Sequence, residues 1–199
     1  MRIRILIAAI LLSGSLFAQD LLTGFTYTIA VPTGDTNDFI DQTSFKGLSI
    51  DLRKFLSHYT SIGFLAGWSA FDKSVPEQRS DEGFQPTQDR LINAFPVMAT
   101  AHYYLGEGRE FRPFIGVGVG GLYVFQSNET ETGTLESSVW HFGVAPEAGF
   151  VYLLGSVYAL VNVKYNYGFS AQNQITGKST AQSYFAFNIG LAFTPLTYF

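Results

Sequence analysis

Side chains alternate with a period of two along most of the chain after residue 20. Bulky apolar residues stand at one parity and small or polar residues at the other, which is typical of β-strands with two different faces. Helical periodicity is almost absent there. Eight strands are therefore predicted, at residues 22–31, 46–56, 61–71, 92–104, 113–125, 139–154, 157–168 and 183–193.

The connections between these predicted strands alternate in length. Those after the second, fourth and sixth strands are short and read SHYT, LGEGRE and GS. The others are long, at residues 32–45, 72–91, 126–138 and 169–182. An up-and-down barrel with this order has all long loops at one mouth, as outer-membrane barrels have extracellular loops and short periplasmic turns. We therefore predict an all-β, eight-stranded, antiparallel up-and-down transmembrane β-barrel.

The first residues have the layout of a secretory signal peptide. A cationic MRIR is followed by 14 apolar residues and by a cleavage zone after Ala18. This apolar stretch is shorter than the roughly 20 residues that span a bilayer. The sequence thus predicts a signal peptide at residues 1–18 and a barrel domain at residues 19–199. No later run is long and apolar enough for a spanning helix, so a membrane form of the mature chain must be a barrel.

Composition decides which face of the strands meets lipid. Charged residues make up only 14% of the chain, against about 25% in soluble domains. The bulky side chains at every second position are together too large for the narrow lumen of eight strands. This face of the strands is therefore predicted to meet hydrocarbon. The lipid-facing residues include Phe64, Val117, Val119, Phe142, Phe185 and Phe187. Two aromatic girdles are expected, with Trp68, Tyr123, Trp140 and Tyr167 on the loop side and Tyr103 and Tyr152 on the turn side.

A glycine series interrupts one strand in the stretch PFIGVGVGGLYV. Glycine weakens a strand interior because it packs nothing. If Val117 and Val119 face lipid, then Gly116, Gly118 and Gly120 face a crowded lumen and leave room for long polar side chains from other strands. Gly121 is instead expected to form a bulge or bend, since two adjacent glycines end the alternation.

The tightest turn fixes a register that can be checked. Gly155 and Ser156 suit a two-residue type II′ hairpin, so opposed residues sum to 311 and Glu147 faces Lys164. We predict that this ion pair lies in the lumen. An interior polar cluster that plugs or gates the barrel is expected from Asp51, Arg53, His102, Glu147 and Lys164. Removing one partner would leave a buried charge, at a cost of about 3–5 kcal/mol.

The chain resembles the small outer-membrane β-barrel families of the OmpA, OmpX and OmpW type, within the broad porin-like group. The resemblance rests on VPTGDTNDFIDQTSFKG after the first strand, RPFIGVGVGGLYV on the fifth and WHFGVAPEAGF on the sixth. The final Phe199 is similar to the C-terminal aromatic residue of such barrels. The resemblance implies outer-membrane localisation, contacts with outer-membrane lipids and lipopolysaccharide, biogenesis by the barrel-assembly machinery, and a monomer.

The residues offer little chemistry beyond this architecture. The chain has no cysteine, no Gly-rich phosphate loop that enters a helix, and no basic stripe for nucleic acid. No cofactor, metal site or catalytic residue is predicted. Asp35, Asp38 and Asp41 lack EF-hand spacing, although eleven acidic residues in the long loops could hold Ca²⁺ or Mg²⁺ beside lipopolysaccharide. His141 lies near the predicted rim without a catalytic partner.

Three functions therefore remain open. The first is a structural or surface-presenting barrel with a polar, plugged interior and four long acidic extracellular loops. The second is a narrow porin-like conduit for small solutes. The third is a lipid-modifying surface enzyme, which would depend on His141 and is the weakest of the three. We expect no enzymatic activity.

Overall fold

The computed structural model describes residues 20–80, 83–85, 87–106, 108, 110–130, 133–172 and 179–194. Eight antiparallel strands close into a barrel in the order β1-β10-β9-β8-β7-β6-β3-β2. The strands are β1 (Leu21–Thr33), β2 (Lys46–Phe55), β3 (Thr60–Val75), β6 (Gln88–Tyr104), β7 (Phe111–Thr130), β8 (Gly133–Leu154), β9 (Val157–Gln172) and β10 (Ser179–Phe193). The predicted fold class is confirmed.

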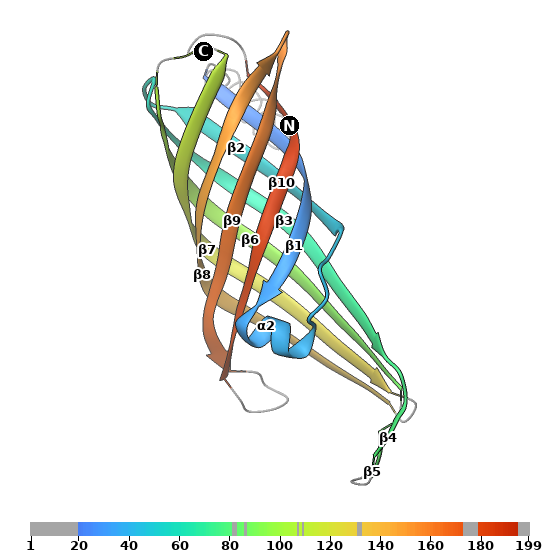
Figure 1. Cartoon of the computed structure of the whole chain (residues 1–199). Helices are drawn as coiled ribbons and strands as arrows, with labels where there is room; N and C mark the ends of the chain where they lie inside the picture. The colour runs from blue at the N-terminus through green and yellow to red at the C-terminus, as the bar shows by residue number, and fades with distance from the viewer. Residues whose placement is uncertain are drawn as a thin grey trace, which may run out of the picture.

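Three short elements lie at the long-loop end of the barrel (Figure 1). The helix α2 (Gly34–Phe39) follows β1, and the strands β4 (Gln78–Ser80) and β5 (Gly83–Gln85) pair between β3 and β6. Among the described residues, no helix is long and apolar enough to cross a membrane. The connections predicted to be short lie at the other end, but the connection between β7 and β8 at the loop end is short as well, so the loops are sorted by length only in part.

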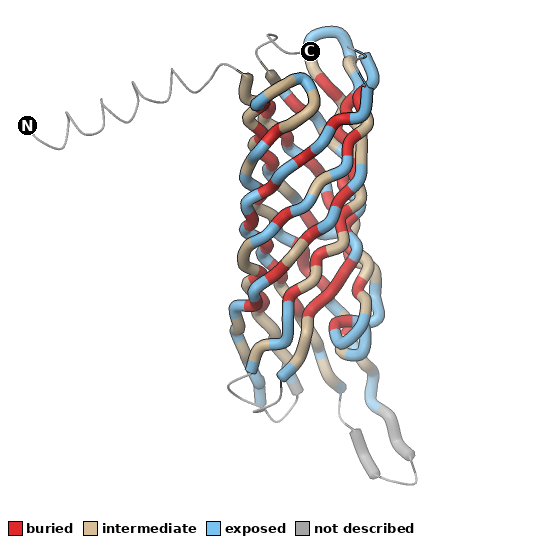
Figure 2. The backbone as a smooth tube through the Cα atoms, turned by 90° about the vertical axis from the view of Figure 1, so that its left-hand side faces the viewer, coloured by how far each residue is buried: buried red, intermediate tan, exposed pale blue. Residues whose placement is uncertain are grey.

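Buried and exposed residues alternate along the barrel strands, as Figure 2 shows. In β1 and β9 every second residue is buried over most of the strand. Since successive side chains of a strand point to opposite faces, one face of the sheet encloses the lumen and the other forms the outside. Each lumen side chain is therefore placed by strand parity and by the register of its two neighbours.

The strands extend further at the loop end than the alternation predicts. The expected loop at residues 126–138 is largely strand, because β7 continues to Thr130 and β8 begins at Gly133. The expected loop at residues 72–91 likewise contains the ends of β3 and β6 together with β4 and β5. These polar segments have no apolar face, so the period of two that reveals the other strands is missing from them.

Gly121 does not form the predicted bulge. Its register is continuous on both sides, with Val97 in β6 and with Phe142 in β8. A Cβ atom at Gly121 would lie 2.8 Å from the Trp140 ring, so this glycine makes room for an aromatic side chain on the outer face. Among the described residues, a register shift is found instead in β10, between Thr180 and Gln182.

Candidate functional site

Four strands bring the predicted interior cluster together in the lumen. Asp51 and Arg53 stand two residues apart in β2, His102 lies in β6, Glu147 in β8 and Lys164 in β9. In the ring of eight strands β8 lies opposite β2, so the cluster crosses the barrel. All five residues are buried, with exposed fractions of 0–6%.

Two anions and two cations neutralise one another in this cluster. Arg53 binds Asp51 through both Nε and Nη2, at 3.1 Å and 2.7 Å. Its Nη2 also lies 3.6 Å from Glu147 Oε1 on the opposite wall. Lys164 Nζ is 3.4 Å from Glu147 Oε2 and 3.5 Å from Asp51 Oδ2. The result is a closed layer of ion pairs across the lumen, in which each charge has an opposite charge beside it.

Further polar and aromatic groups complete the layer. The Nε2 atom of His102 is hydrogen-bonded to Glu147 Oε1, and its Nδ1 lies 3.2 Å from Ser61 Oγ. Arg53 donates a further hydrogen bond to Tyr104 Oη at 3.2 Å. The guanidinium carbon of Arg53 lies 4.2 Å from the centroid of the Phe114 ring, a cation–π distance. Arg53 therefore contacts four residues, Asp51, Glu147, Tyr104 and Phe114.

The hairpin between β8 and β9 places Glu147 against Lys164. Gly155 has a φ of +69°, the conformation that the first position of a type II′ turn requires. Leu154 then pairs with Val157, and Glu147 pairs with Lys164 seven residues along the ladder. The ion pair follows from this turn, which was visible in the sequence.

Asp51, His102 and Glu147 also form the one possible metal-ligand group among the described residues, with ligand atoms within 4.8 Å of one another. Their carboxylate oxygens already face Arg53 and Lys164 at 2.7–3.6 Å. A divalent cation would have to displace or repel both basic groups. The donor set therefore does not suit a metal, and we assign none.

The lumen is not polar throughout, which corrects the prediction of a polar interior. An apolar layer, here called the turn-side cluster, lies on the short-turn side of the ion pairs. It consists of Leu22, Phe55, Tyr104, Phe114, Val151, Tyr158, Leu160 and Ala192. A second layer, the mouth cluster, lies on the loop side. It consists of Ala30, Ile40, Phe71, Ile92, Ala94, Leu122, Val124, Tyr184 and Ala186.

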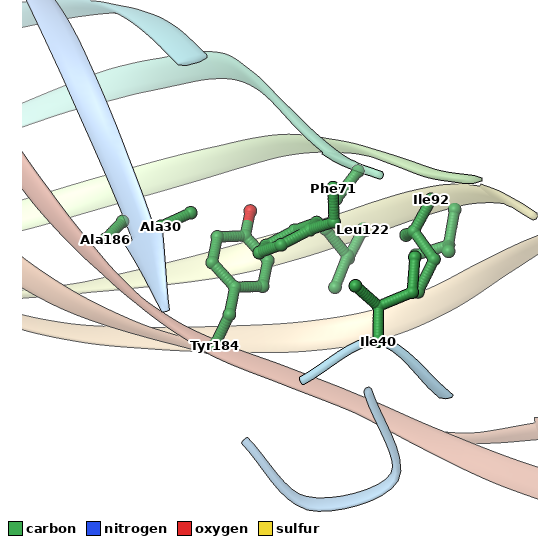
Figure 3. Packing of buried hydrophobic residues seen from close by; sticks show 9 residues of the cluster. Ala30, Ile40, Phe71, Ile92, Leu122, Tyr184 and Ala186 are labelled. Atoms are coloured by element: carbon green, nitrogen blue, oxygen red, sulfur yellow. The ribbon is translucent and has the colours of Figure 1, made fainter. Parts of the chain in front are cut away.

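The mouth cluster packs side chains from several strands against one another at the loop end of the lumen (Figure 3). The Tyr184 and Phe71 rings meet edge to face, with centroids 5.6 Å apart. Ile40, which follows α2, points into the same cluster and is completely buried. Between this layer and the ion pairs lies a cavity of about 20 Å³, lined in part by Lys164, Asn166 and Tyr184. That volume holds about one water molecule.

The segment at residues 34–45, here called loop 1, crosses the mouth and is tied down on both sides. On the β10 side, Thr36 Oγ1 donates to Gln182 Oε1 at 3.0 Å and accepts from the Ser183 amide at 2.9 Å. On the opposite side, Arg90 donates to the Phe39 carbonyl at 3.0 Å. Loop 1 is therefore hydrogen-bonded to two opposite walls at the loop end of the barrel.

The acidic residues of loop 1 do not converge on a cation. Asp35 Oδ2 accepts from the Ala181 amide at 2.9 Å, whereas Asp41 Oδ1 accepts from Lys73 Nζ at 2.6 Å on the other side of the mouth. The hydrogen bond and charge of Lys73 lower the pKa of Asp41 below its ordinary value. These carboxylates fasten the loop, and the predicted cation binding by the wider acidic surface remains a hypothesis.

The residues predicted to face lipid lie on the outside of the barrel. Phe64, Val117, Val119, Phe142, Phe185 and Phe187 are all exposed, with fractions of 39–62%. The predicted girdle residues also point outward. Trp68, Tyr103, Trp140 and Tyr152 are exposed, and the Tyr123 and Trp140 rings lie 5.1 Å apart. Tyr167 lies beside Phe169, at 5.1 Å between ring centroids.

In the described part of the chain, His141 is hydrogen-bonded to a backbone carbonyl. It is buried in β8, and its Nδ1 atom lies 2.9 Å from the Phe169 carbonyl. Gly168 leaves room for it, because a Cβ atom there would come within 2.9 Å of His141 Cβ. The predicted signal peptide and the C-terminal Phe199 lie outside the described residues.

The fold is similar to that of solved outer-membrane barrels. Neisserial surface protein A matches with a TM-score of 0.59 and 12% identity, covering 88% of this chain and 97% of that one. The outer membrane protein OprG from Pseudomonas aeruginosa gives 0.48 and 16%, over 88% and 95% of the two chains. Outer membrane protein W of Escherichia coli gives 0.46 and 17%, over 89% and 98%. No protein-family model and no curated protein matches the sequence. The chain thus has the fold of the small eight-stranded outer-membrane β-barrels.

Proposed function

We propose that this chain is an integral outer-membrane protein with a closed lumen, which presents its loop-side strands at the cell surface. The observation that carries the proposal is the layered interior. A neutral ion-pair layer stands between the turn-side cluster and the mouth cluster, and loop 1 covers the mouth. Such a barrel serves as a membrane-embedded base and not as a pore.

The outer surface supports the membrane location. Large apolar side chains are exposed around the whole ring, for example Phe25 in β1, Ile50 in β2, Ile115 in β7 and Ile189 in β10. A soluble protein rarely exposes contiguous apolar patches of more than a few hundred Å². A continuous belt is what hydrocarbon requires of a spanning barrel.

The surface-presenting part is a four-stranded sheet that extends beyond the closed ring. We call it the projecting sheet and define it by residues 72–75 of β3, 88–91 of β6, 126–130 of β7 and 133–138 of β8. The β2–β3 ladder ends at the pair Lys46–Ala70, and the β8–β9 ladder ends at Gly143–Gly168. Figure 1 shows these four strands running on past α2 toward β4 and β5.

Conductance of the purified protein in a planar lipid bilayer tests the closed lumen. We expect no steady single-channel conductance from the wild-type protein. Lys164→Ala should also fail to conduct, because both apolar layers and loop 1 remain, although it breaks the ion-pair layer. Lys46→Ala, which changes a lysine on the outer surface, is the matched control.

A steady conductance from the wild-type protein would overturn the proposal and favour the narrow conduit for small solutes. If Lys164→Ala conducts while the wild-type protein does not, then the ion pairs by themselves block the lumen. That result would contradict the layered interior. The proposal gives His141 no catalytic role, because its Nδ1 atom faces a backbone carbonyl and not a carboxylate.

A further inference from the structure

A small cavity lies inside the lumen, between the ion-pair layer and the mouth cluster. Its volume is about 20 Å³, and residues from opposite walls of the barrel line it. Lys164 and Asn166 come from β9, whereas Gly67 and Ser69 come from β3, the strand opposite β9 in the ring. The cavity is therefore a feature of the lumen, built from parts of the chain that are distant in sequence.

Small residues on both walls leave this space. Lys164 pairs with Ala186 across the β9–β10 ladder, so the long lysine has only a methyl group beside it on the lumen face. On the opposite wall, Ser49 of β2 pairs with Gly67 of β3, which has no side chain. All four residues line the cavity. The space thus follows from which residues share this height of the lumen.

Two buried oxygen atoms on residues that line the cavity have no hydrogen-bond partner within the described part of the chain. They are Asn166 Oδ1 and Tyr184 Oη, on residues that are each 2% exposed and that pair across the β9–β10 ladder. Figure 3 shows the Tyr184 hydroxyl pointing away from Ile40 of the mouth cluster. Burying a polar group without a hydrogen bond is costly, so nearly all buried polar atoms have a partner.

Lys164 brings hydrogen-bond donors to the same place. Its Nζ lies 3.4 Å from Glu147 Oε2 and 3.5 Å from Asp51 Oδ2, whereas strong charge-assisted hydrogen bonds measure about 2.7–2.9 Å. An ammonium group has three N–H donors, and these two long contacts leave donor capacity for a group inside the cavity. The cavity therefore has a donor, an acceptor and a hydroxyl that can act as either.

The charges beside the cavity select a neutral ligand. Arg53 and Lys164 balance Asp51 and Glu147, so the ion-pair layer has no net charge. A chloride ion or a metal ion would add an unbalanced charge to the buried lumen, which is costly. The volume matches about one water molecule, and cavities that stay empty are lined by apolar groups and not by polar ones.

We propose that this cavity is a hydration site, in which one water molecule accepts a hydrogen bond from Lys164 Nζ, donates one to Asn166 Oδ1 and makes a third with Tyr184 Oη. Three partners are the usual number for a buried water. The water then joins the ion-pair layer to the mouth cluster, so the lumen is closed without being dry. This inference rests on the proposed closed lumen, because only a closed lumen holds a water in place.

Nuclear magnetic resonance tests the site directly, on the full-length protein in lipid nanodiscs with ¹⁵N-labelled asparagine. We expect cross-relaxation between water and the side-chain amide protons of Asn166, with the sign that an immobilised water gives. Asn93 is the internal control, because it lies half-buried on the outer face, where it accepts a hydrogen bond from Trp68 Nε1. It should show no such signal. The lack of a water signal at a resolved Asn166 side chain would overturn the proposal.

Removal of the Tyr184 hydroxyl gives a second, independent measurement. Tyr184→Phe keeps the ring in the mouth cluster but takes one partner from the water, so the equilibrium constant for unfolding in lipid vesicles should rise by about three- to tenfold. Tyr165→Phe removes a hydroxyl from the outer face of β9, beside Phe185, and should leave the constant nearly unchanged. In a dry cavity, Tyr184→Phe would only remove a buried hydroxyl that has no partner. An unchanged or lower unfolding constant for this variant would therefore overturn the proposal.

The hydration site and the closed lumen can fail separately. A barrel that does not conduct and shows no water signal at Asn166 would end this inference and leave the closed lumen standing. A barrel that conducts and still shows the signal would do the reverse.

Discussion

The glycines of β7 show how single residues set the packing of the lumen. A Cβ atom at Gly116 would lie 2.5 Å from His102 Cδ2 and 3.2 Å from Glu147 Cγ. Gly116 thus leaves space for two members of the ion-pair layer, as its parity predicted. Gly118 instead faces Met98, whose sulfur would lie 3.2 Å from an added Cβ. The expectation that these glycines accommodate polar chains therefore holds for Gly116 and is wrong for Gly118.

These two positions give a matched pair of substitutions. Gly116→Ala should lower the free energy of unfolding by about 1–3 kcal/mol, because the His102 ring is held by Glu147 and Ser61 and cannot move aside. Gly118→Ala should cost less than about 1 kcal/mol, because methionine changes rotamer easily. Denaturant unfolding in lipid vesicles, followed by tryptophan fluorescence, measures both. Equal costs would contradict the packing described for His102.

Residue-level prediction succeeded where the turn chemistry was unambiguous. Gly155 and Ser156 determine the β8–β9 register, and with it the meeting of Glu147 and Lys164. It missed the apolar lumen residues, such as Leu122 and Tyr184, because bulky side chains were assigned to the outer face. Their parity was the available signal, since Leu122 lies at even spacing from Gly116, Gly118 and Gly120 and must point the same way.

Among the elements, loop 1 combines a short helix with polar ties to both walls. Its residue Ile40 fills the mouth cluster, and Asp41 binds Lys73. The three aspartates of this segment favoured a solvated loop, and that was the expectation. Burial of one isoleucine against residues of four distant strands is a tertiary effect, which local patterns do not contain.

The Asp41–Lys73 pair should make loop 1 sensitive to acid. The folded protein holds the pKa of Asp41 below its ordinary value, so the pair stabilises the loop above about pH 4 and loses this effect as pH falls further. Hydrogen exchange of the loop 1 amides should therefore speed up between about pH 5 and pH 3. The intrinsic pH dependence of exchange has to be subtracted from this comparison.

Two variants isolate the pair. Lys73→Met should remove the acid-dependent part of loop 1 protection, whereas Lys46→Met, at an ion pair outside loop 1, should keep it. An unchanged pH profile in Lys73→Met would show that Asp41 does not fasten the loop.

The strands at the loop end were harder to predict than those in the barrel wall. Inside hydrocarbon, one face of each strand must be apolar, so the alternation is strong. Beyond it both faces meet water, and stretches such as QSNET and GTLESS carry no period of two. The projecting sheet was therefore read as loops, although its strands are continuous with those of the barrel.

The molecule as a whole is a barrel with an apolar outer surface and a lumen in which polar and apolar layers alternate. Ion pairs occupy the middle of the lumen, apolar clusters lie on both sides of them, and Ile40 of loop 1 packs into the mouth cluster. The apolar outer surface was predictable from the parity of the side chains, and the up-and-down strand order from the lengths of the connections. The alternation of polar and apolar layers was not, because it depends on which lumen residues share a height across eight strands.

The most direct test of the central claim is the accessibility of spin labels on the outer face. The chain has no cysteine, so Phe64→Cys, Val117→Cys and Phe187→Cys each give one labelling site in vesicles, and Asp38→Cys in loop 1 is the aqueous control. We expect the three wall labels to collide often with oxygen and rarely with a water-soluble nickel complex, and the Asp38 label to show the reverse. Wall labels as open to the nickel complex as the Asp38 label would show that this face meets water, and the account of a membrane-spanning barrel would be wrong.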